Sequence, residues 1–197
     1  MALRIWPKSY LDAGTKPIYR EDIEDLITVL VLDLPTAVQS VKLEEVQKWN
    51  KSVNELFEIG KENVLKQYPI QIDSEVINEK PCYLLHGEHF FVSTHGLNLE
   101  KYSECIGRYG TIITFPHRHI VITYPINGED IIKSINNLMA AATGMYKDAP
   151  GAISPNIYWY IAGTFTKLPY EANEGTIRFS PPQSFIELLE QIVKEKS

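Results

Sequence analysis

The chain has 197 residues, of which 44% are hydrophobic, and this suits one globular domain with a full core. Its formal net charge of −6 argues against binding to a nucleic-acid backbone and leaves a basic protein partner open. No apolar run reaches membrane-spanning length, and the first residues lack the pattern of a secretory signal, so we expect a cytoplasmic protein without membrane attachment. Only two cysteines occur, so we expect no disulfides.

The N-terminal part is predicted to contain an arm, a buried strand and a long helix. Residues 1 to 20 include Pro and Gly and show no period, which indicates an extended arm or a frayed terminus, followed by a single domain over residues 21 to 197. Leu26 to Leu32 is an almost unbroken run of Leu, Ile and Val, typical of a strand buried on both faces. Apolar residues recur at helical spacing from Leu43 to Leu65, so we expect one long helix there.

Short elements are predicted in the middle of the chain. Cys82 to Leu85 and Phe90 to Ser93 have the composition of strands, and His86 to His89 is predicted to form a tight turn between them. Leu97 to Ile106 is expected to form a short helix.

A hairpin followed by a helix is predicted next, and we expect the rest of the chain to pack around it. Thr111 to Phe115 and Ile120 to Tyr124 are rich in β-branched and aromatic residues, as paired strands are, and Pro116 to His119 forms the turn. Apolar side chains then recur at three- and four-residue steps from Ile131 to Met145, with Asn127 as the expected N-cap.

The C-terminal part is predicted to add strands and one more helix. Ile157 to Ile161, Phe165 to Leu168 and Thr176 to Phe179 are strand candidates, and Ser180-Pro181 has the pattern of a helix start. Hairpins and helices in separate blocks favour an α+β fold, with an antiparallel or mixed sheet built from hairpins and covered by three to four helices.

Several short motifs resemble a known family. Asp33-Leu34-Pro35 after the buried strand, Phe115 to Arg118 between the paired strands, and Ile153 to Tyr158 after the helix are similar to the YtpQ-like bacterial proteins of unknown function. The resemblance spans about residues 26 to 168. It implies a cytoplasmic α+β protein and supplies no activity and no catalytic residues. Where the family pattern has an acidic residue after the arginine of the turn, this chain has His119.

The histidines are concentrated in one part of the sequence. All of them lie between positions 86 and 119: His86, His89, His95, His117 and His119. If the predicted hairpins are neighbours, three or more imidazoles could converge, and three His with one water is a known open zinc arrangement. The alternative interpretation is that these residues flank turns and are polar for solvation alone.

An aromatic run provides a second candidate site. Alternation along a strand places Tyr158 and Tyr160 on one face and Trp159 on the other, so one face is core and the other could be an exposed patch that anchors a protein partner. Plain packing on both faces is the alternative. The candidate binding residues are His117, Arg118, His119, Tyr158, Trp159 and Tyr160.

Other chemistry finds little support in the sequence. No GxSxG, Walker A, GxGxxG or kinase-type motif occurs. Cys82 and Cys105 lie in apolar surroundings, as inert buried thiols do. Asp22, Glu24 and Asp25 are interpreted as a solvated loop.

Two hypotheses of function follow from these observations. The first is a non-catalytic, cytoplasmic binding or regulatory protein, of which an immunity protein is one example, without a cofactor and with a protein partner that the negative net charge suggests is basic. The second is a small metal-dependent hydrolase that uses the histidine cluster with zinc or another divalent metal.

Overall fold

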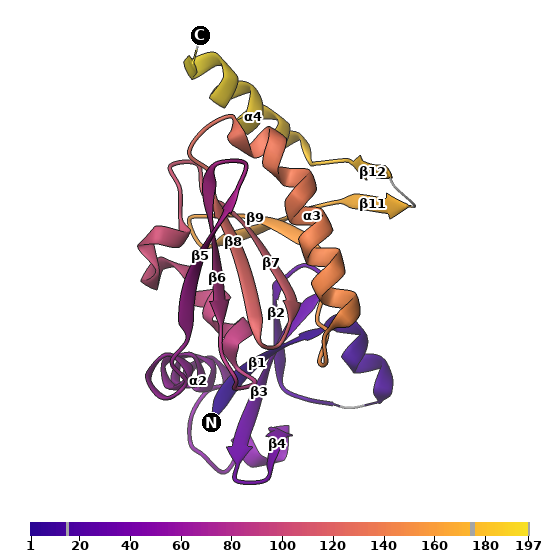
Figure 1. Ribbon diagram of the computed structural model, residues 1–197. Helices are drawn as coiled ribbons and strands as arrows, with labels where there is room; N and C mark the ends of the chain where they lie inside the picture. The colour runs from indigo at the N-terminus through magenta and orange to yellow at the C-terminus, as the bar shows by residue number, and fades with distance from the viewer. Residues whose placement is uncertain (15, 174–175, 197) are drawn as a thin grey trace.

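The computed structural model describes residues 1–14, 16–173 and 176–196, and its first sheet is built on the predicted buried strand (Figure 1). β3 (Leu26–Leu34) lies at the centre of this N-terminal sheet, antiparallel to β1 (Ala2–Pro7) on one side. β2 (Tyr19–Ile23) and β4 (Ala37–Ser40) pair with β3 on the other side. The Leu, Ile and Val side chains of β3 from Leu26 to Val31 are buried because elements cover both faces of the strand, whereas Leu34 at its end is exposed.

The predicted arm and the predicted long helix both differ from the structure. Residues 2 to 7 are β1, which pairs with β3 over its whole length, and Lys8–Ala13 follows as a 3₁₀ helix, η1. The helix is divided into α1 (Leu43–Val46) and α2 (Val53–Gln67). The division has a local cause, because Ser52 starts a new helix with a capping box in which it exchanges hydrogen bonds with Glu55.

The second sheet has six antiparallel strands in the order β10-β9-β7-β8-β6-β5. They are β5 (Gln71–Ile77), β6 (Lys80–His86), β7 (Thr111–His117), β8 (Ile120–Pro125), β9 (Ile157–Ile161) and β10 (Thr164–Leu168). A separate hairpin of β11 (Tyr170–Asn173) and β12 (Thr176–Phe179) follows and extends away from the sheet (Figure 1).

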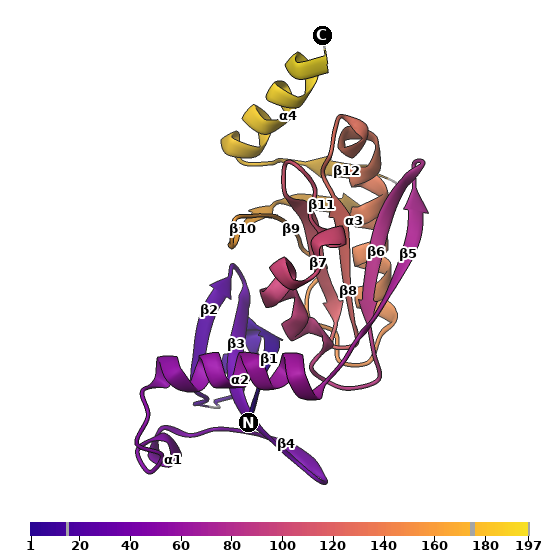
Figure 2. The same cartoon turned by 90° about the vertical axis from the view of Figure 1, so that its left-hand side faces the viewer.

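The sheet is covered on both faces near its centre. α3 (Asp130–Asp148) lies along one face, and the 3₁₀ helices η2 (Val92–Lys101) and η3 (Ser103–Cys105) lie on the other (Figure 2). α4 (Gln183–Lys196) continues the α3 side. The predicted α+β class, with antiparallel hairpin sheets and covering helices, is confirmed.

The central hairpin β7–β8 occupies the middle of the core. Its alternate side chains point to opposite faces, so Ile112 and Ile122 pack under α3 while Ile113 and Val121 pack on the η2 side. All four side chains are at most 2% exposed. The predicted organising role of this hairpin and its helix therefore agrees with the packing.

The hairpin of β6 differs from the prediction. β6 pairs with the preceding strand β5, through a turn in which Asn78 and Glu79 both have positive φ, and residues 90 to 93 are not its partner strand. Instead, Phe90 and Phe91 lie in the connection to η2, and the expected helix at 97 to 106 is formed by the 3₁₀ segments. Asn at φ > 0 is a strong hairpin turn residue, which explains why this turn forms at Asn78.

Two helix starts also differ. The N-cap of α3 is Glu129, and the Oδ1 of Asn127 instead accepts a hydrogen bond of 2.9 Å from the backbone N–H of Arg108. α4 begins at Gln183, three residues after Ser180, with the N–H of Phe185 bonded to the carbonyl oxygen of Pro182. Across the described residues, every helix is too short or too polar to cross a membrane.

Substitution of Gly110 tests how tightly β7 is enclosed. Gly110 has φ +85°, and a Cβ there would lie 2.3 Å from the carbonyl oxygen of Tyr160. Gly14 has a similar φ of +75° and no atom within 4 Å of its Cβ position. We expect Gly14→Ala to lower the unfolding free energy by about 1 kcal/mol through backbone strain alone, and Gly110→Ala to lower it by about 2 kcal/mol more. Urea unfolding measures both, and equal losses would contradict the enclosure of β7.

Candidate functional site

A cleft of about 660 Å³ opens against strands β5 and β6 of the six-stranded sheet and beside the β7–β8 turn. We call it the His86 cleft. Its lining comes from β5, β6, the residues that follow β6, and the β7–β8 turn: Pro69, Gln71, Asp73, Leu84, His86, Gly87, Glu88, His117, His119 and Ile120. The lining contains two carboxylates and no Lys or Arg.

His86 and Asp73 form the one imidazole–carboxylate contact of the cleft. The Nε2–H of His86 donates to Oδ2 of Asp73 at 2.8 Å. The side chain of Asp73 is 64% exposed, so solvent screens this pair and it contributes little to stability. The pair orients the imidazole and leaves carboxylate acceptors of Asp73 and Glu88 facing the cleft.

Three of the five histidines line the His86 cleft, as the metal hypothesis required, but each of them already makes a hydrogen bond within the protein. His119 uses both ring nitrogens: Nδ1–H donates to the carbonyl oxygen of Gly87 at 3.2 Å, and Nε2 accepts from Nε of Arg118 at 2.9 Å. His117 accepts the backbone N–H of His119 on Nδ1. Burial, together with the nearby His119 and Arg118, lowers the pKa of His117. Within the described residues, no three His, Cys, Asp or Glu side chains are grouped so that they could hold a metal ion.

The other two histidines hold the η2 segment in place. His95 is buried, donates from Nε2–H to the carbonyl oxygen of Tyr68 at 2.8 Å, and accepts from the hydroxyl of Tyr102 on Nδ1 at 2.5 Å. His89 donates from Nε2–H to the carbonyl oxygen of Pro69 and accepts the backbone N–H of Phe91. These two imidazoles therefore support the fold and are not among the residues that line the cleft.

The aromatic run of β9 is packed on both faces. Tyr158 and Tyr160 are at most 2% exposed in the core on the η2 side. Trp159 is half-buried on the other face, where its ring packs against Phe185 of α4 and its Nε1–H donates to the carbonyl oxygen of Tyr109 at 2.9 Å. β9 therefore presents no open aromatic face at these residues, and the packing alternative describes them.

Neither cysteine has the environment of a nucleophile. Cys82 and Cys105 are both free and at most 1% exposed. Burial raises the pKa of the Cys82 thiol to about 12 and that of Cys105 to about 11. Both thiols stay protonated at neutral pH, so they act as apolar packing.

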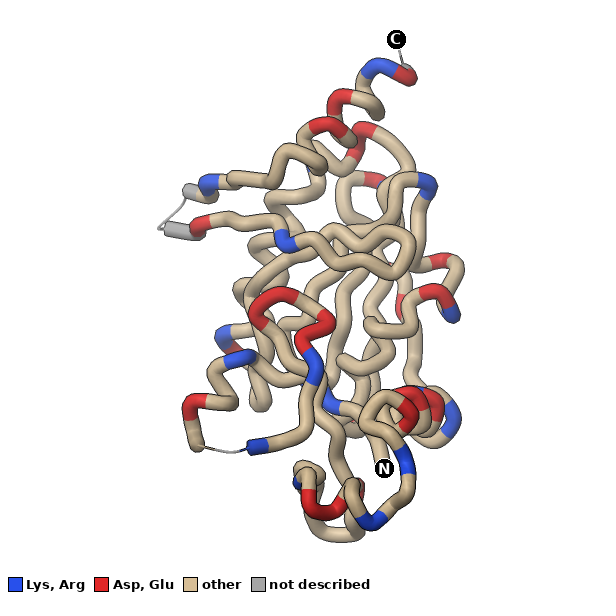
Figure 3. Tube along the Cα trace, turned by 180° about the vertical axis from the view of Figure 1, so that it is seen from behind, with Lys and Arg blue, Asp and Glu red and all other residues tan. Residues whose placement is uncertain are grey.

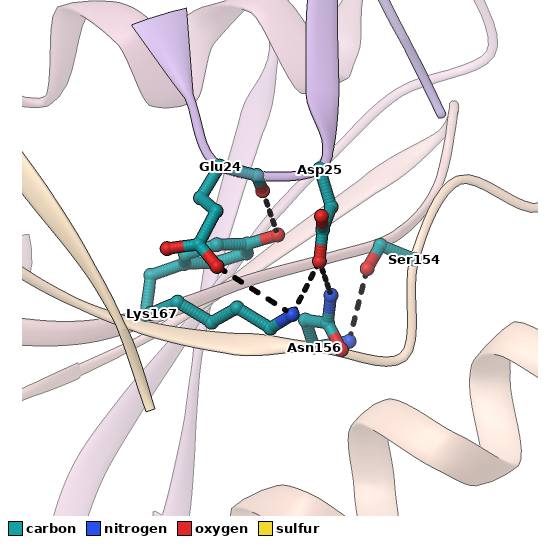
Figure 4. A network of polar contacts seen from close by, with 6 residues as sticks. Glu24, Asp25, Ser154, Asn156 and Lys167 are labelled. Carbon is teal, nitrogen blue, oxygen red and sulfur yellow. Dashed lines mark hydrogen bonds and ion pairs between the residues drawn. The ribbon is translucent and has the colours of Figure 1, made fainter. Parts of the chain in front are cut away.

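The acidic turn between β2 and β3 is exposed to solvent, as expected, and it also contacts the six-stranded sheet (Figure 4). Asp25, at φ +66°, accepts a hydrogen bond from Nζ of Lys167 on β10 and another of 3.3 Å from the side-chain amide of Asn156. The backbone carbonyl of Glu24 accepts the hydroxyl of Tyr158 at 2.9 Å. No local sequence pattern indicates this network, because its residues are about 130 positions apart.

Acidic residues are distributed over several faces of the molecule. Seen from behind, they gather at the β2–β3 turn and along α2 (Figure 3). At the β2–β3 turn, Lys167 and Arg20 neutralise part of the charge. The carboxylates at the His86 cleft have no such cation among the lining residues.

Comparison with protein-family models, with curated proteins and with solved structures finds no match to this chain. The candidate site therefore depends on the geometry of this chain alone.

The buried imidazole of His95 makes stability depend on pH. Burial lowers the pKa of His95 from 6.5 to about 4. As the pH falls, His95 is therefore protonated in the unfolded chain before it is protonated in the folded protein. The contribution of neutral His95 to the unfolding free energy is complete above pH 6.5 and is lost as the pH falls toward 4. We expect the unfolding free energy of the protein relative to His95→Gln to fall by about 2 kcal/mol between pH 7 and pH 5. Urea unfolding of both proteins at both pH values measures this difference. If the unfolding free energies of the unaltered protein and of His95→Gln changed equally with pH, the neutral, buried state of His95 would be contradicted.

Proposed function

We propose that this chain is a non-catalytic, cytoplasmic binding protein of the regulatory or immunity type, which holds a basic, extended segment of a partner protein along strand β5. The observation that supports the proposal best is that β5, at the edge of the six-stranded sheet, carries Asp73 and Glu75 and has no Lys or Arg between Gln71 and Ile77. The His86 cleft beside β5 would take one basic side chain of that segment.

The edge of β5 is protected by the charges of Asp73 and Glu75 and by none of the backbone devices that usually block strand addition. Exposed edges commonly carry Lys, Pro or a bulge, or are very short. β5 has seven consecutive pairs with β6, without a register shift and without Pro, and β6 is its one strand neighbour in the described part of the chain. Figure 2 shows β5 along the outer margin of the sheet. Backbone groups on its outer side suit the addition of a strand from a partner.

Charge favours a basic partner over a second copy of this chain. If two β5 strands paired antiparallel about Ser74, Asp73 of each copy would lie opposite Glu75 of the other. Like charges directly opposite each other destabilise a strand pair. A segment with Lys or Arg at these positions replaces that repulsion with attraction.

The chemistry of the cleft agrees with a cationic guest. Asp73 and Glu88 provide carboxylate oxygens, and an ammonium or guanidinium group supplies donors beyond the one that His86 gives to Asp73. Exposed ion pairs contribute about 0.2–1 kcal/mol each, so backbone pairing must provide most of the affinity. Charge then decides which segment is accepted.

The alternative of a metal-dependent hydrolase gains no support from the geometry of the cleft. Both ring nitrogens of His119 are engaged, which leaves it no lone pair for a metal. The relationship to the YtpQ-like proteins stays a prediction, and it would add no activity.

A labelled ten-residue peptide of alternating Lys and Val tests the proposal by fluorescence anisotropy. We expect it to bind, and a peptide of alternating Glu and Val not to bind. Asp73→Asn/Glu75→Gln should weaken binding by about tenfold, because two exposed charge pairs are lost. Glu100→Gln/Glu104→Gln removes the same charge from exposed positions on η2 and η3 and should leave affinity unchanged.

Strand addition has its own control. A peptide that adds to an edge uses the N–H groups of alternate residues, so N-methylation of one alternate set should abolish binding and methylation of the other set should not. Equal binding of the two methylated peptides would contradict strand addition, and equal binding of the Lys and Glu peptides would contradict a basic partner.

A further inference from the structure

Two arginine side chains near the contact between the sheets have no carboxylate partner. Arg4 lies on β1 of the N-terminal sheet, and Arg118 lies in the turn between β7 and β8. Among residues 1–14, 16–173 and 176–196, neither forms an ion pair, whereas Arg20 and Arg108 both do. In an acidic chain with carboxylates to spare, two adjacent unpaired guanidinium groups require an explanation.

The two guanidinium groups share one aromatic ring. Cζ of Arg118 lies 4.2 Å from the ring centroid of Phe90, and Cζ of Arg4 lies 5.5 Å from the same centroid. Arg4 also stacks on Trp6, with Cζ 3.9 Å from the ring centroid, and Trp6 stacks on Tyr10. The stack holds two positive charges close together, and the proximity of Arg118, after burial, lowers the pKa of Arg4 to about 10, so Arg4 remains charged at neutral pH.

Stacking does not satisfy the hydrogen-bond donors of this cluster. Cation–π contacts use the faces of the guanidinium, whereas its N–H groups point outward in the plane. Arg4 is 92% buried, since its exposed fraction is 8%, and its Nε has no acceptor. The indole Nε1–H of Trp6 is also buried without an acceptor. Buried donors without partners are costly, and a charged one more so.

Arg118 leaves donors available as well. Its Nε donates to Nε2 of His119, and no hydrogen bond is made by its two terminal nitrogens within the described structure. Gly151 packs against the aliphatic part of the side chain, which fixes its direction. Apart from the bond between Arg118 and His119, the cluster therefore has two positive charges and several N–H donors for which no acceptor is found in the described structure.

We propose that Arg4 and Arg118 bind an oxyanion, a phosphate or a carboxylate group, at the edge of the Phe90 ring. An oxyanion supplies the missing acceptors, and the planar fork of Arg suits both phosphate and carboxylate. It also offsets the repulsion between the two guanidinium groups. This proposal does not depend on a basic partner at β5, although Arg118 contacts His119 of the His86 cleft.

The test is a titration followed by ¹H–¹⁵N NMR at the indole N–H of Trp6 and the Nε–H of Arg4. Inorganic phosphate and acetate are added separately at constant ionic strength set with chloride. We expect a saturable shift of both signals with at least one of the two anions, and the tighter of them identifies the ligand chemistry. Sodium chloride alone should give no saturable shift, because a general salt effect lacks the fork geometry.

Matched arginine variants locate the site. Arg118→Gln should weaken anion binding at least tenfold, and Arg118→Lys, which keeps the charge and loses the fork, should weaken it several-fold. Arg20→Gln is the control, because Arg20 also stacks on a ring, that of Phe57 at 4.3 Å, but already has Asp22 and Glu58 as partners. Its anion binding should match that of the unaltered protein.

Three results would overturn the site: no saturable shift with phosphate or acetate, the same shift with chloride, or unchanged binding in the Arg118 variants. If Arg118→Gln does not fold, the titrations of the unaltered protein and of Arg118→Lys decide the question. None of these outcomes bears on the peptide experiment at β5.

Discussion

Burial of the β7–β8 hairpin on both faces is the constraint on which the rest of this structure depends. Side chains such as Ile112 and Ile113 alternate between two cores, one under α3 and one against η2. A strand pair buried on both faces has no place for charged groups, because an unpaired charge in such a core costs several kcal/mol. Polar side chains are therefore found at the ends of these strands and at the margins of the sheet.

That constraint explains where the candidate sites lie. The β7–β8 turn extends past both cores and carries His117, Arg118 and His119. It meets the ends of β5 and β6 and completes the His86 cleft, and Arg118 reaches Phe90 near β1 of the other sheet. The acidic β2–β3 turn contacts the six-stranded sheet through Lys167 (Figure 4), and a buried apolar cluster that includes Leu26 and Tyr158 joins the two sheets. The β7–β8 turn thus contributes both to the His86 cleft beside the acidic edge of β5 and to the positively charged cluster of Arg4 and Arg118.

The sequence predicted the elements with strong local patterns and missed the contacts between distant segments. The run at Leu26, the hairpin of β7 and β8 and the amphipathic α3 have clear periods, so their positions were predictable. Strand pairing was not, because composition does not say which neighbour a strand joins, and β6 pairs backward with β5. The clustering of the histidines was visible in the sequence. Whether an imidazole can bind a metal depends on its tautomer and on its hydrogen-bond partners. Those partners, such as the carbonyl groups of Gly87 and Tyr68, come close only in the folded chain. No local sequence pattern indicates that Arg4 lacks an ion-pair partner.

Native-state amide hydrogen exchange of the free protein tests the central claim, that the middle of the six-stranded sheet is closed and β5 is open for pairing. The account predicts the slowest exchange in β7 and β8, close to the limit set by global unfolding. Exchange in β5 should be faster by at least about a hundredfold, since β5 is at the edge of the sheet and pairs with β6 alone among the described strands. Exchange in β5 as slow as in β7 would mean that the edge is already protected, and it would contradict the account.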